Sequence, residues 1–340
     1  MRAAVWHGSN VGLKIEDIPK PRISPGQVLV KVAACGVCHT DLHYIEHGVP
    51  TFKKPPVVLG HEASGIVEEV GGEVTNLKVG QRVLIPAVLT CGRCMFCRMG
   101  RENICANMTM LGNHIDGAYA EYVAVPAKDL LELPASIPLE EASIIADATS
   151  TPYHAVKNRA RVQPGDTVVI FGCGGVGINA VQLATAAGGY VIAVDINDRK
   201  LEWATQFGAA KTINAAKVER VSKEVKKLTG GGADVCLEVI GNPRTLEEAF
   251  ECVRIGGRLC VVGYTNEAIQ IIGGKIMFKE IEIVGSLGCR PLDYVPLIRM
   301  VEQGRIDIKR QVTHKFKLEE LTKAFDVMKE GVSLRSIVIP

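Results

Sequence analysis

The sequence predicts an α/β protein of two units, one mainly β and the other a doubly wound parallel sheet. Its 340 residues exceed what one hydrophobic core usually serves. Near residue 164, Val- and Ile-rich stretches punctuated by Gly and Pro give way to alternating strand and helix patterns. The net charge is +2 and no long run of like charges occurs, so neither a nucleic-acid partner nor a membrane partner is expected.

The mainly β prediction rests on four stretches rich in Val, Ile and Tyr, several of which alternate polar and apolar residues. They cover residues 27–37, 65–70, 81–88 and 119–125. After them, residues 139–160 change to a helical period.

The parallel sheet is predicted because strand and helix patterns follow one another in turn. Residues 168–171 and 190–194 are predicted strands, followed by helices from about Gly175 and from Asp198. The same rhythm continues with a charged helix at 217–228, a strand at 234–241, another helix, and strands at 258–263 and 281–286. Beyond residue 290 we expect two helices and a strand at 334–339, which either extends the parallel sheet or returns to the first unit.

Two features bear on the cell compartment. Residues 167–194 carry no charged side chain and are long enough to span a bilayer, but six glycines break them into strand, turn, helix and strand. The first residues lack the apolar run of a secretory signal, and the cysteine count of eleven is odd. We therefore expect a cytoplasmic chain with reduced thiols.

Four cysteines are closely spaced between residues 91 and 105. The spacing C-x2-C-x2-C-x7-C suits a closed tetrahedral zinc site, because thiolates are soft ligands. A reducing compartment disfavours disulfides, and a bacterial iron–sulfur run would end C-x3-C-P. A closed site stabilises a loop and performs no chemistry, and a zinc-ribbon interaction module would look the same. The ligands are Cys91, Cys94, Cys97 and Cys105.

A second set of metal ligands precedes this cluster. Cys38 and His61 are candidates for a catalytic zinc, which takes three protein ligands and leaves one position open. Asp41 is a plausible carboxylate partner for the ring of His61, and Glu62 follows it directly. A single histidine would more often be an ordinary core or surface residue, but this grouping favours a metal site.

A glycine-rich loop follows the strand at 168–171. Gly172, Gly174 and Gly177 form G-x-G-x-x-G between a strand and a helix, which is the context that a dinucleotide-binding loop requires. The alternative is a turn that serves packing only. Asp195 ends the next strand and could accept hydrogen bonds from the ribose hydroxyls while repelling a 2′-phosphate. This favours NAD over NADP, although Arg199 and Lys200 follow closely.

Together these motifs resemble the zinc-dependent medium-chain alcohol dehydrogenases over essentially the whole chain. The resemblance is carried by the Cys38 segment, 60-GHE-62, the four-cysteine lobe, the glycine-rich fold and 334-LRSIV-338. It implies a GroES-like catalytic domain at 1–150 and 290–340, and a Rossmann NAD-binding domain at 151–289. It also implies one catalytic and one structural zinc, with the active site in a cleft between the domains.

The resemblance also implies roles for single residues. Thr40 matches a hydroxyl that hydrogen-bonds the substrate oxygen and starts a proton relay. His43 matches the residue from which this relay passes the proton to solvent. Glu62 matches a carboxylate behind the zinc that can become a transient ligand. The implied cofactor contacts are His39, Thr151, Gly172, Gly174, Gly175, Val176, Gly177, Asp195, Lys200, Val239, Ile240, Val262, Gly263, Leu287 and Arg335.

The third catalytic zinc ligand departs from the common pattern. Many relatives have a cysteine there, which gives a Cys2His ligand set. The matching residue here is Asp147, and some bacterial relatives, including enzymes of secondary alcohols, resemble it. The alternative is that Asp147 caps a helix and Glu62 is the third ligand.

The resemblance implies reversible hydride transfer between an alcohol and NAD, giving an aldehyde or ketone. The alternatives are a polyol dehydrogenase of the same family and a non-catalytic zinc-ribbon protein that senses NAD. Apolar pocket walls are expected near residues 85–88, residues 111–114 and Leu287, which favours a hydrophobic substrate. A homotetramer is expected from the resemblance alone.

Overall fold

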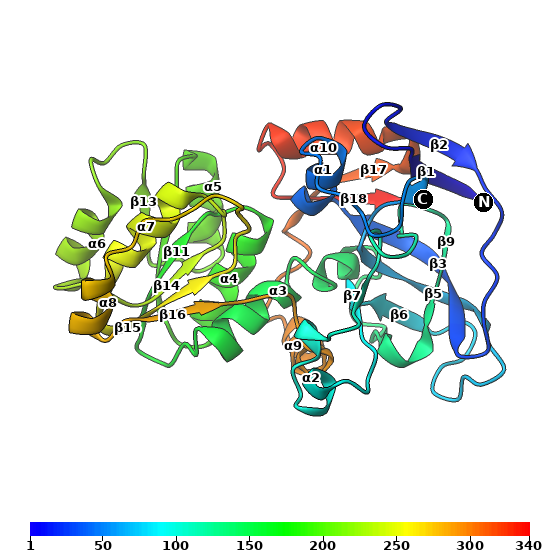
Figure 1. Ribbon diagram of the computed structural model, residues 1–340, viewed down its shortest axis with the longest axis horizontal. Coiled ribbons are helices and arrows are strands. Elements are labelled where there is room, and N and C mark those ends of the chain that lie inside the picture. Colours follow the sequence, from blue (N-terminus) through cyan, green and yellow to red (C-terminus); the bar gives the residue numbers. More distant parts are fainter. The chain divides into compact units, whose positions relative to one another are not determined.

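The computed structural model describes all 340 residues, which form two compact units. The first unit combines Met1–Ser150 with Cys289–Pro340, and the second is the continuous segment Thr151–Gly288. The first is mainly β and the second has a parallel sheet, so the predicted fold class is confirmed (Figure 1).

The first unit is organised around strand β3 (Gln27–Gly36), which pairs antiparallel with β5 (Glu62–Val70), β9 (Tyr122–Pro126) and β18 (Arg335–Ile339). Its Val and Ala side chains are largely buried, because this strand lies in the middle of a seven-stranded sheet. The other strands of that sheet are β6 (Arg82–Ile85), β10 (Leu131–Glu132) and β17 (Val312–Lys317).

Strand β18 returns to the first unit, which decides between the two placements left open above. It lies between β3 and β17, antiparallel to the former and parallel to the latter (Figure 1). Strand β17 was not predicted. Its sequence VTHKFK carries two lysines and a histidine, and lysines are common on edge strands, where they discourage pairing with other chains. Exposed and less exposed side chains alternate along it, but only Val312 and Phe316 are apolar, so the signal in the sequence is short.

Smaller elements complete the first unit. Strands β7 (Val88–Leu89) and β8 (Thr109–Met110) pair and bracket the four-cysteine lobe. The remaining elements are β1 (Arg2–Trp6), β2 (Leu13–Asp17), β4 (Val57–Val58), α1 (His39–Ile45), α2 (Met95–Arg98), η1 (Glu102–Ile104), η2 (Ala127–Asp129), η3 (Glu141–Ile145), α9 (Pro291–Glu302), η5 (Leu318–Glu320) and α10 (Leu321–Lys329).

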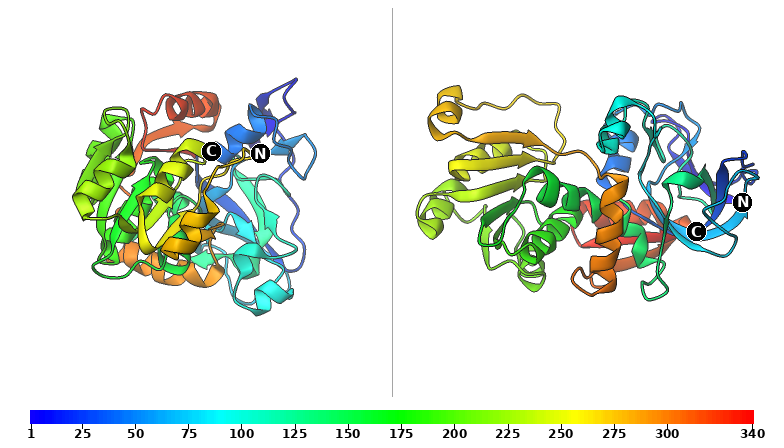
Figure 2. Two further views of the ribbon diagram at one scale, coloured as in Figure 1. Left: turned by 60° about the vertical axis from the view of Figure 1, so that its left-hand side comes forward. Right: turned by 90° about the horizontal axis from the view of Figure 1, so that it is seen from below.

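The second unit has one six-stranded parallel sheet with the order β13-β12-β11-β14-β15-β16. Strands β12 and β13 follow β11 on one side of the sheet, whereas β14, β15 and β16 lie on its other side. In parallel sheets, ligands bind at the carboxyl ends of the strands where this order reverses, which here is between β11 and β14. Helices cover both faces of the sheet (Figure 2). The strands are β11 (Thr167–Phe171), β12 (Tyr190–Asp195), β13 (Lys211–Asn214), β14 (Ala233–Glu238), β15 (Val253–Val261) and β16 (Glu282–Gly285). The helices are α4 (Gly175–Ala186), α5 (Asp198–Gln206), α6 (Val221–Thr229), α7 (Pro243–Cys252) and α8 (Gly273–Lys279).

The helical stretch predicted at 139–160 is present but interrupted. It consists of η3, α3 (Ser150–Tyr153) and the π-type segment η4 (His154–Arg159). Asp147 lies in the turn between the first two, where the chain is not held in one continuous helix. No helix of the chain combines the length and the apolar character needed to cross a membrane.

Candidate active site and metal centres

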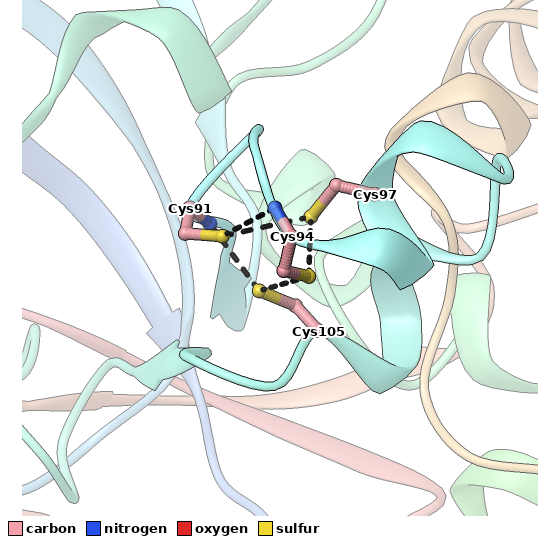
Figure 3. A group of neighbouring side chains, drawn as sticks. All are labelled: Cys91, Cys94, Cys97 and Cys105. Carbon is pink, nitrogen blue, oxygen red and sulfur yellow. Dashed lines mark hydrogen bonds between the residues drawn. The ribbon is translucent and has the colours of Figure 1, made fainter.

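The four cysteines of the lobe bring their sulfur atoms together (Figure 3). The Sγ–Sγ distance is 3.5 Å from Cys94 to Cys97, 3.8 Å from Cys94 to Cys105 and 3.9 Å from Cys91 to Cys97. A tetrahedral zinc with Zn–S bonds of about 2.3 Å separates its sulfur ligands by about 3.8 Å. Because the observed distances match that edge, the donor set fits a four-thiolate zinc.

Within the lobe, the surroundings of Cys91 favour its ionisation and those of Cys97 oppose it. The N–H of Cys94 donates to Cys91 Sγ at 3.3 Å, and the N–H of Cys91 donates to Cys105 Sγ at 3.4 Å. Backbone N–H groups of Arg93 and Cys94 lower the pKa of Cys91 to about 6. Burial raises the pKa of Cys97 to about 12. A bound cation must therefore supply the charge that keeps the more buried thiol ionised.

A second cluster joins residues that are far apart in the sequence. The ligand atoms of Cys38, His61, Glu62 and Asp147 all lie within 4.8 Å of one another. His61 Nε2 is 3.5 Å from Asp147 Oδ2, and ligands of a tetrahedral zinc with bonds of about 2.0–2.1 Å are about 3.4 Å apart. Cys38 immediately precedes α1, and His61 immediately precedes β5, so two ordered elements hold these ligands.

His61 is buried with its polar atoms unsatisfied. It is 1% exposed, and neither ring nitrogen has a hydrogen-bond partner. Its Nδ1 faces Asp41 Oδ1 at 3.4 Å, so Nε2 is left for the cluster. Burial lowers the pKa of His61, but the negative charges of Asp41 and Cys38 outweigh it and raise that pKa well above its usual value. Surroundings this negative favour a cation, and a metal bound at Nε2 would satisfy an otherwise costly buried atom.

Glu62 has a partner outside the ligand cluster. Its carboxylate forms a buried ion pair with Arg335 at the start of β18. The pair lies against β3, because a Cβ atom on Gly36 would be only 2.1 Å from Glu62 Oε2. Burial raises the pKa of Glu62, against the lowering effect of Arg335. One carboxylate oxygen is thus committed to the guanidinium group, whereas Glu62 Oε1 has no hydrogen-bond partner.

Helix α1 carries the other expected catalytic residues. Thr40 Oγ1 is 3.6 Å from Cys38 Sγ, which places its hydroxyl beside the cluster. His43 Nδ1 is 3.0 Å from the Nδ1 atom of His47, one helical turn further on. Burial and His47 lower the pKa of His43. His39 opens the helix and is exposed.

In the glycine-rich loop, Gly174 has space for a side chain and Gly177 has none. A Cβ on Gly177 would lie 1.8 Å from the carbonyl oxygen of Gly172, so α4 packs directly onto the loop. A Cβ on Gly174 would meet nothing within 4 Å. Gly174, Gly175 and Val176 are partly exposed at the start of α4, where free N–H groups favour a phosphate. The loop fits a pyrophosphate that approaches the backbone at Gly174.

Gly177→Ala is expected to destabilise the second unit by about 1–3 kcal/mol, because the new methyl group overlaps a backbone carbonyl. Gly174→Ala is the matched control, since its methyl group enters open space and its φ of −77° suits alanine. Urea unfolding of both variants measures the difference. Equal stability of the two variants would contradict this account of the loop.

Asp195 ends β12 with both carboxylate oxygens occupied by backbone donors. The N–H of Cys173 donates to Oδ2 at 2.8 Å, and the N–H of Asn197 donates to Oδ1 at 3.0 Å. These bonds tie the end of β12 to the glycine-rich loop. Lys200 lies in the first turn of α5, after the cap formed by the side chain of Asn197.

The expected nicotinamide contacts lie at the carboxyl ends of β14 and β15. Val262 and Gly263 donate their N–H groups to the carbonyl oxygen of Glu238 at 2.8 and 3.0 Å, which joins the two ends. Val239 and Ile240 approach the glycine-rich loop, because a Cβ on Gly172 would meet Ile240 Cγ1 at 2.6 Å. Among the other expected contacts, Thr151 is partly buried in α3 and Leu287 is 56% exposed.

Three residues of these sites were missed at the level of sequence. The buried Glu238 accepts hydrogen bonds from the N–H groups of Ile240 and Gly241 and so shapes the loop after β14. Tyr119 bonds to Asp41, and His47 bonds to His43. A glutamate at the end of an apolar strand was a usable signal for the first; the other two depend on tertiary contacts. Of the expected pocket walls, Ile85 and Leu111 are fully buried in the core.

Family models match both units of the chain. Residues 24–135 match the alcohol dehydrogenase GroES-like domain, and residues 175–303 match the zinc-binding dehydrogenase model. An alcohol dehydrogenase of Geobacillus stearothermophilus is 36% identical over 332 residues, 97% of each chain. A sorbitol dehydrogenase of Bacillus subtilis is 36% identical over 332 residues, 96% of this chain and 93% of that one.

A solved structure agrees with these matches. The alcohol dehydrogenase from Thermus sp. ATN1 superposes with a TM-score of 0.93 at 30% identity, over 100% of this chain and 99% of that one. Two matching domain models, full-length relatives and a shared fold thus point the same way, and the predicted resemblance is confirmed. The chain belongs to the zinc-dependent medium-chain alcohol dehydrogenases and is an oxidoreductase of that family.

Proposed function

We propose that this protein is an NAD-dependent alcohol dehydrogenase that uses a catalytic and a structural zinc. The observation that carries the proposal is the cluster of Cys38, His61, Glu62 and Asp147, with the nitrogens of His61 buried and unsatisfied. His61 is the costly member of the cluster, because a buried ring whose nitrogens lack hydrogen-bond partners is unfavourable unless it holds a metal. The non-catalytic sensor has no use for such a cluster.

Cys38, His61 and Asp147 are proposed to hold the catalytic zinc, and Cys91, Cys94, Cys97 and Cys105 the structural one. Asp147 is preferred to Glu62 because Arg335 already occupies a carboxylate oxygen of Glu62. When bound, zinc supplies the Lewis acidity that lowers the pKa of an alcohol, and NAD supplies the hydride acceptor. Glu62 stays beside the ligands, where its charge remains balanced by Arg335.

The chain's own residues position the alcohol and carry its proton. Thr40 Oγ1, beside Cys38 Sγ, is proposed to accept a hydrogen bond from the substrate hydroxyl. His43 is proposed to release the proton to solvent, and its lowered pKa keeps it neutral near pH 7, able to accept a proton. The first unit is thus proposed as the catalytic domain and the second as the cofactor-binding domain.

Asp195 is proposed to select NAD, because its carboxylate would repel a 2′-phosphate. In Asp195→Ser we expect the ratio of kcat/KM for NAD to that for NADP to fall by about 10- to 100-fold, or about 1.4–2.7 kcal/mol. Steady-state rates with each cofactor measure this ratio. Asp198→Ser is the control: it removes the same charge from a residue paired with Lys217, and the ratio should not move.

The substrate class is tested by initial rates of NAD reduction with matched primary alcohols, secondary alcohols and polyols. We propose a monohydric alcohol, with a secondary alcohol favoured by the carboxylate ligand Asp147. The 36% identity to a sorbitol dehydrogenase keeps a polyol as the second candidate. Turnover of polyols alone would select that candidate, and a chain with one zinc and no turnover would select the NAD sensor. The proposed homotetramer is checked by light scattering on the same preparation.

A further inference from the structure

Tyr119 is a fully buried tyrosine whose hydroxyl reaches the residue behind His61. The Tyr119 hydroxyl donates to Asp41 Oδ2 at 2.8 Å and lies 3.0 Å from the carbonyl oxygen of Gly36. A hydroxyl has one hydrogen, and the nearer, charged carboxylate is the stronger acceptor. We propose that Tyr119 is a positioning residue for the catalytic metal, holding Asp41 so that Asp41 orients His61. This inference rests on the proposed function, since it requires a metal at His61.

The contacts form one continuous path from Tyr119 to the ligand cluster. The Tyr119 hydroxyl donates to Oδ2 of Asp41, whereas Oδ1 of the same carboxylate faces His61 Nδ1 at 3.4 Å. A metal-ligating histidine usually gives its second N–H to a carboxylate, which fixes the tautomer and the orientation of the ring. The hydrogen bond from Tyr119 to Oδ2 favours the orientation in which Oδ1 faces the ring. Tyr119 therefore orients His61 indirectly, through Asp41.

The backbone fixes Tyr119 relative to His61. The N–H of Tyr119 donates to the carbonyl oxygen of Leu59 at 3.0 Å, and the N–H of Ala118 donates to that of Gly60 at 2.9 Å. Gly60 has a φ of +92°, and a Cβ there would lie 2.9 Å from the Tyr119 ring. The ring thus packs directly on the turn that leads into His61. The same turn of the backbone therefore positions both the Tyr119 hydroxyl and the His61 ring.

Burial makes this hydrogen bond matter. Asp41 and Tyr119 are both 0% exposed, so water cannot replace the hydroxyl if it is removed. Burial, followed by the charge of Asp41, raises the pKa of Tyr119 well above its usual value, so the hydroxyl remains a donor. Without it, Oδ2 of Asp41 would be left buried and unsatisfied, and the carboxylate would no longer be fixed in front of His61.

Tyr119→Phe tests the proposal, because it removes the hydroxyl and keeps the ring. The measurement is the affinity of the catalytic site for zinc by chelator competition, with Cys38→Ala as the reference that retains only the structural ion. We expect the affinity to fall by about tenfold, at the lower end of the effect of outer partners of metal ligands. Tyr122→Phe, a nearby tyrosine with a partly exposed ring beside Lys20, should leave it unchanged.

A double-mutant cycle decides whether Tyr119 acts through Asp41. In an Asp41→Asn background, Tyr119→Phe should change zinc affinity by less than about twofold, because the residue it positions has lost its charge. An equal loss in both backgrounds would overturn the proposal. So would a lower unfolding temperature with unchanged zinc affinity, which would mean that the hydroxyl serves only its contact with Gly36. Equal zinc contents in the wild type and Cys38→Ala would instead overturn the metal site itself, and this inference with it.

Discussion

Replacing Cys38 with alanine is expected to lower kcat/KM by about 10³-fold or more and to reduce bound zinc from two ions to one per chain. The substitution removes the only thiolate of the cluster and leaves His61 buried beside Asp41 and Asp147. Polarisation of the substrate by a metal is worth several kcal/mol, and about 1.4 kcal/mol corresponds to each factor of ten in rate. Steady-state kinetics and metal analysis of the same preparation give both values.

Cys35→Ala is the matched control for Cys38→Ala. Cys35 is a buried thiol three residues away, and burial raises its pKa so far that it stays protonated and is a poor metal ligand. The control should keep both zinc ions and most of the turnover. Full activity of Cys38→Ala, with its zinc content verified, would refute the proposed mechanism.

Cys94→Ser is expected to have the opposite profile, with a large loss of stability and little loss of turnover per folded molecule. The Cys94 sulfur lies 3.5 and 3.8 Å from those of Cys97 and Cys105, so its loss breaks the four-thiolate set. Structural zinc contributes folding free energy directly. A loss of about 3–5 kcal/mol would lower the unfolding temperature by about 10 °C or more.

Calorimetry and activity measured at low temperature separate these two effects. Met95→Ala is the control, because Met95 is next in the sequence, is 63% exposed and carries no metal ligand. It should leave both the unfolding temperature and the zinc content unchanged. If Cys94→Ser lost turnover as completely as Cys38→Ala, the lobe could not be a purely structural site.

Features encoded by neighbouring residues were predictable from the sequence. The glycine-rich loop, β11 and α4 form one continuous stretch, and their signals do not depend on distant partners. Strand β17 and the placement of β18 were not predictable in the same way. A six-residue edge strand with only two apolar side chains gives a short sequence signal, and the neighbours of a strand are set by the whole sheet.

The same distinction applies to the candidate site. The four cysteines lie within one short stretch, so their spacing alone predicted a cluster. Asp147 is far from Cys38 in the sequence, and only the resemblance pointed to it. The ion pair of Glu62 with Arg335 and the bond of Tyr119 to Asp41 join different elements, so no local pattern could predict them.

The position of β18 has a consequence for synthesis of the protein on the ribosome. The strand enters the sheet between β3 and β17, and Arg335 at its start reaches the buried carboxylate of Glu62. Domains tend to fold in the order of translation. The continuous segment Thr151–Gly288 can fold as soon as it emerges, but the earlier segment must wait for residues translated after it. During that delay the end of β3 at Cys35 and Gly36 lacks its partner strand and Glu62 lacks its counter-ion, so we expect the nascent chain to be most exposed to aggregation and chaperone binding just before translation passes β18.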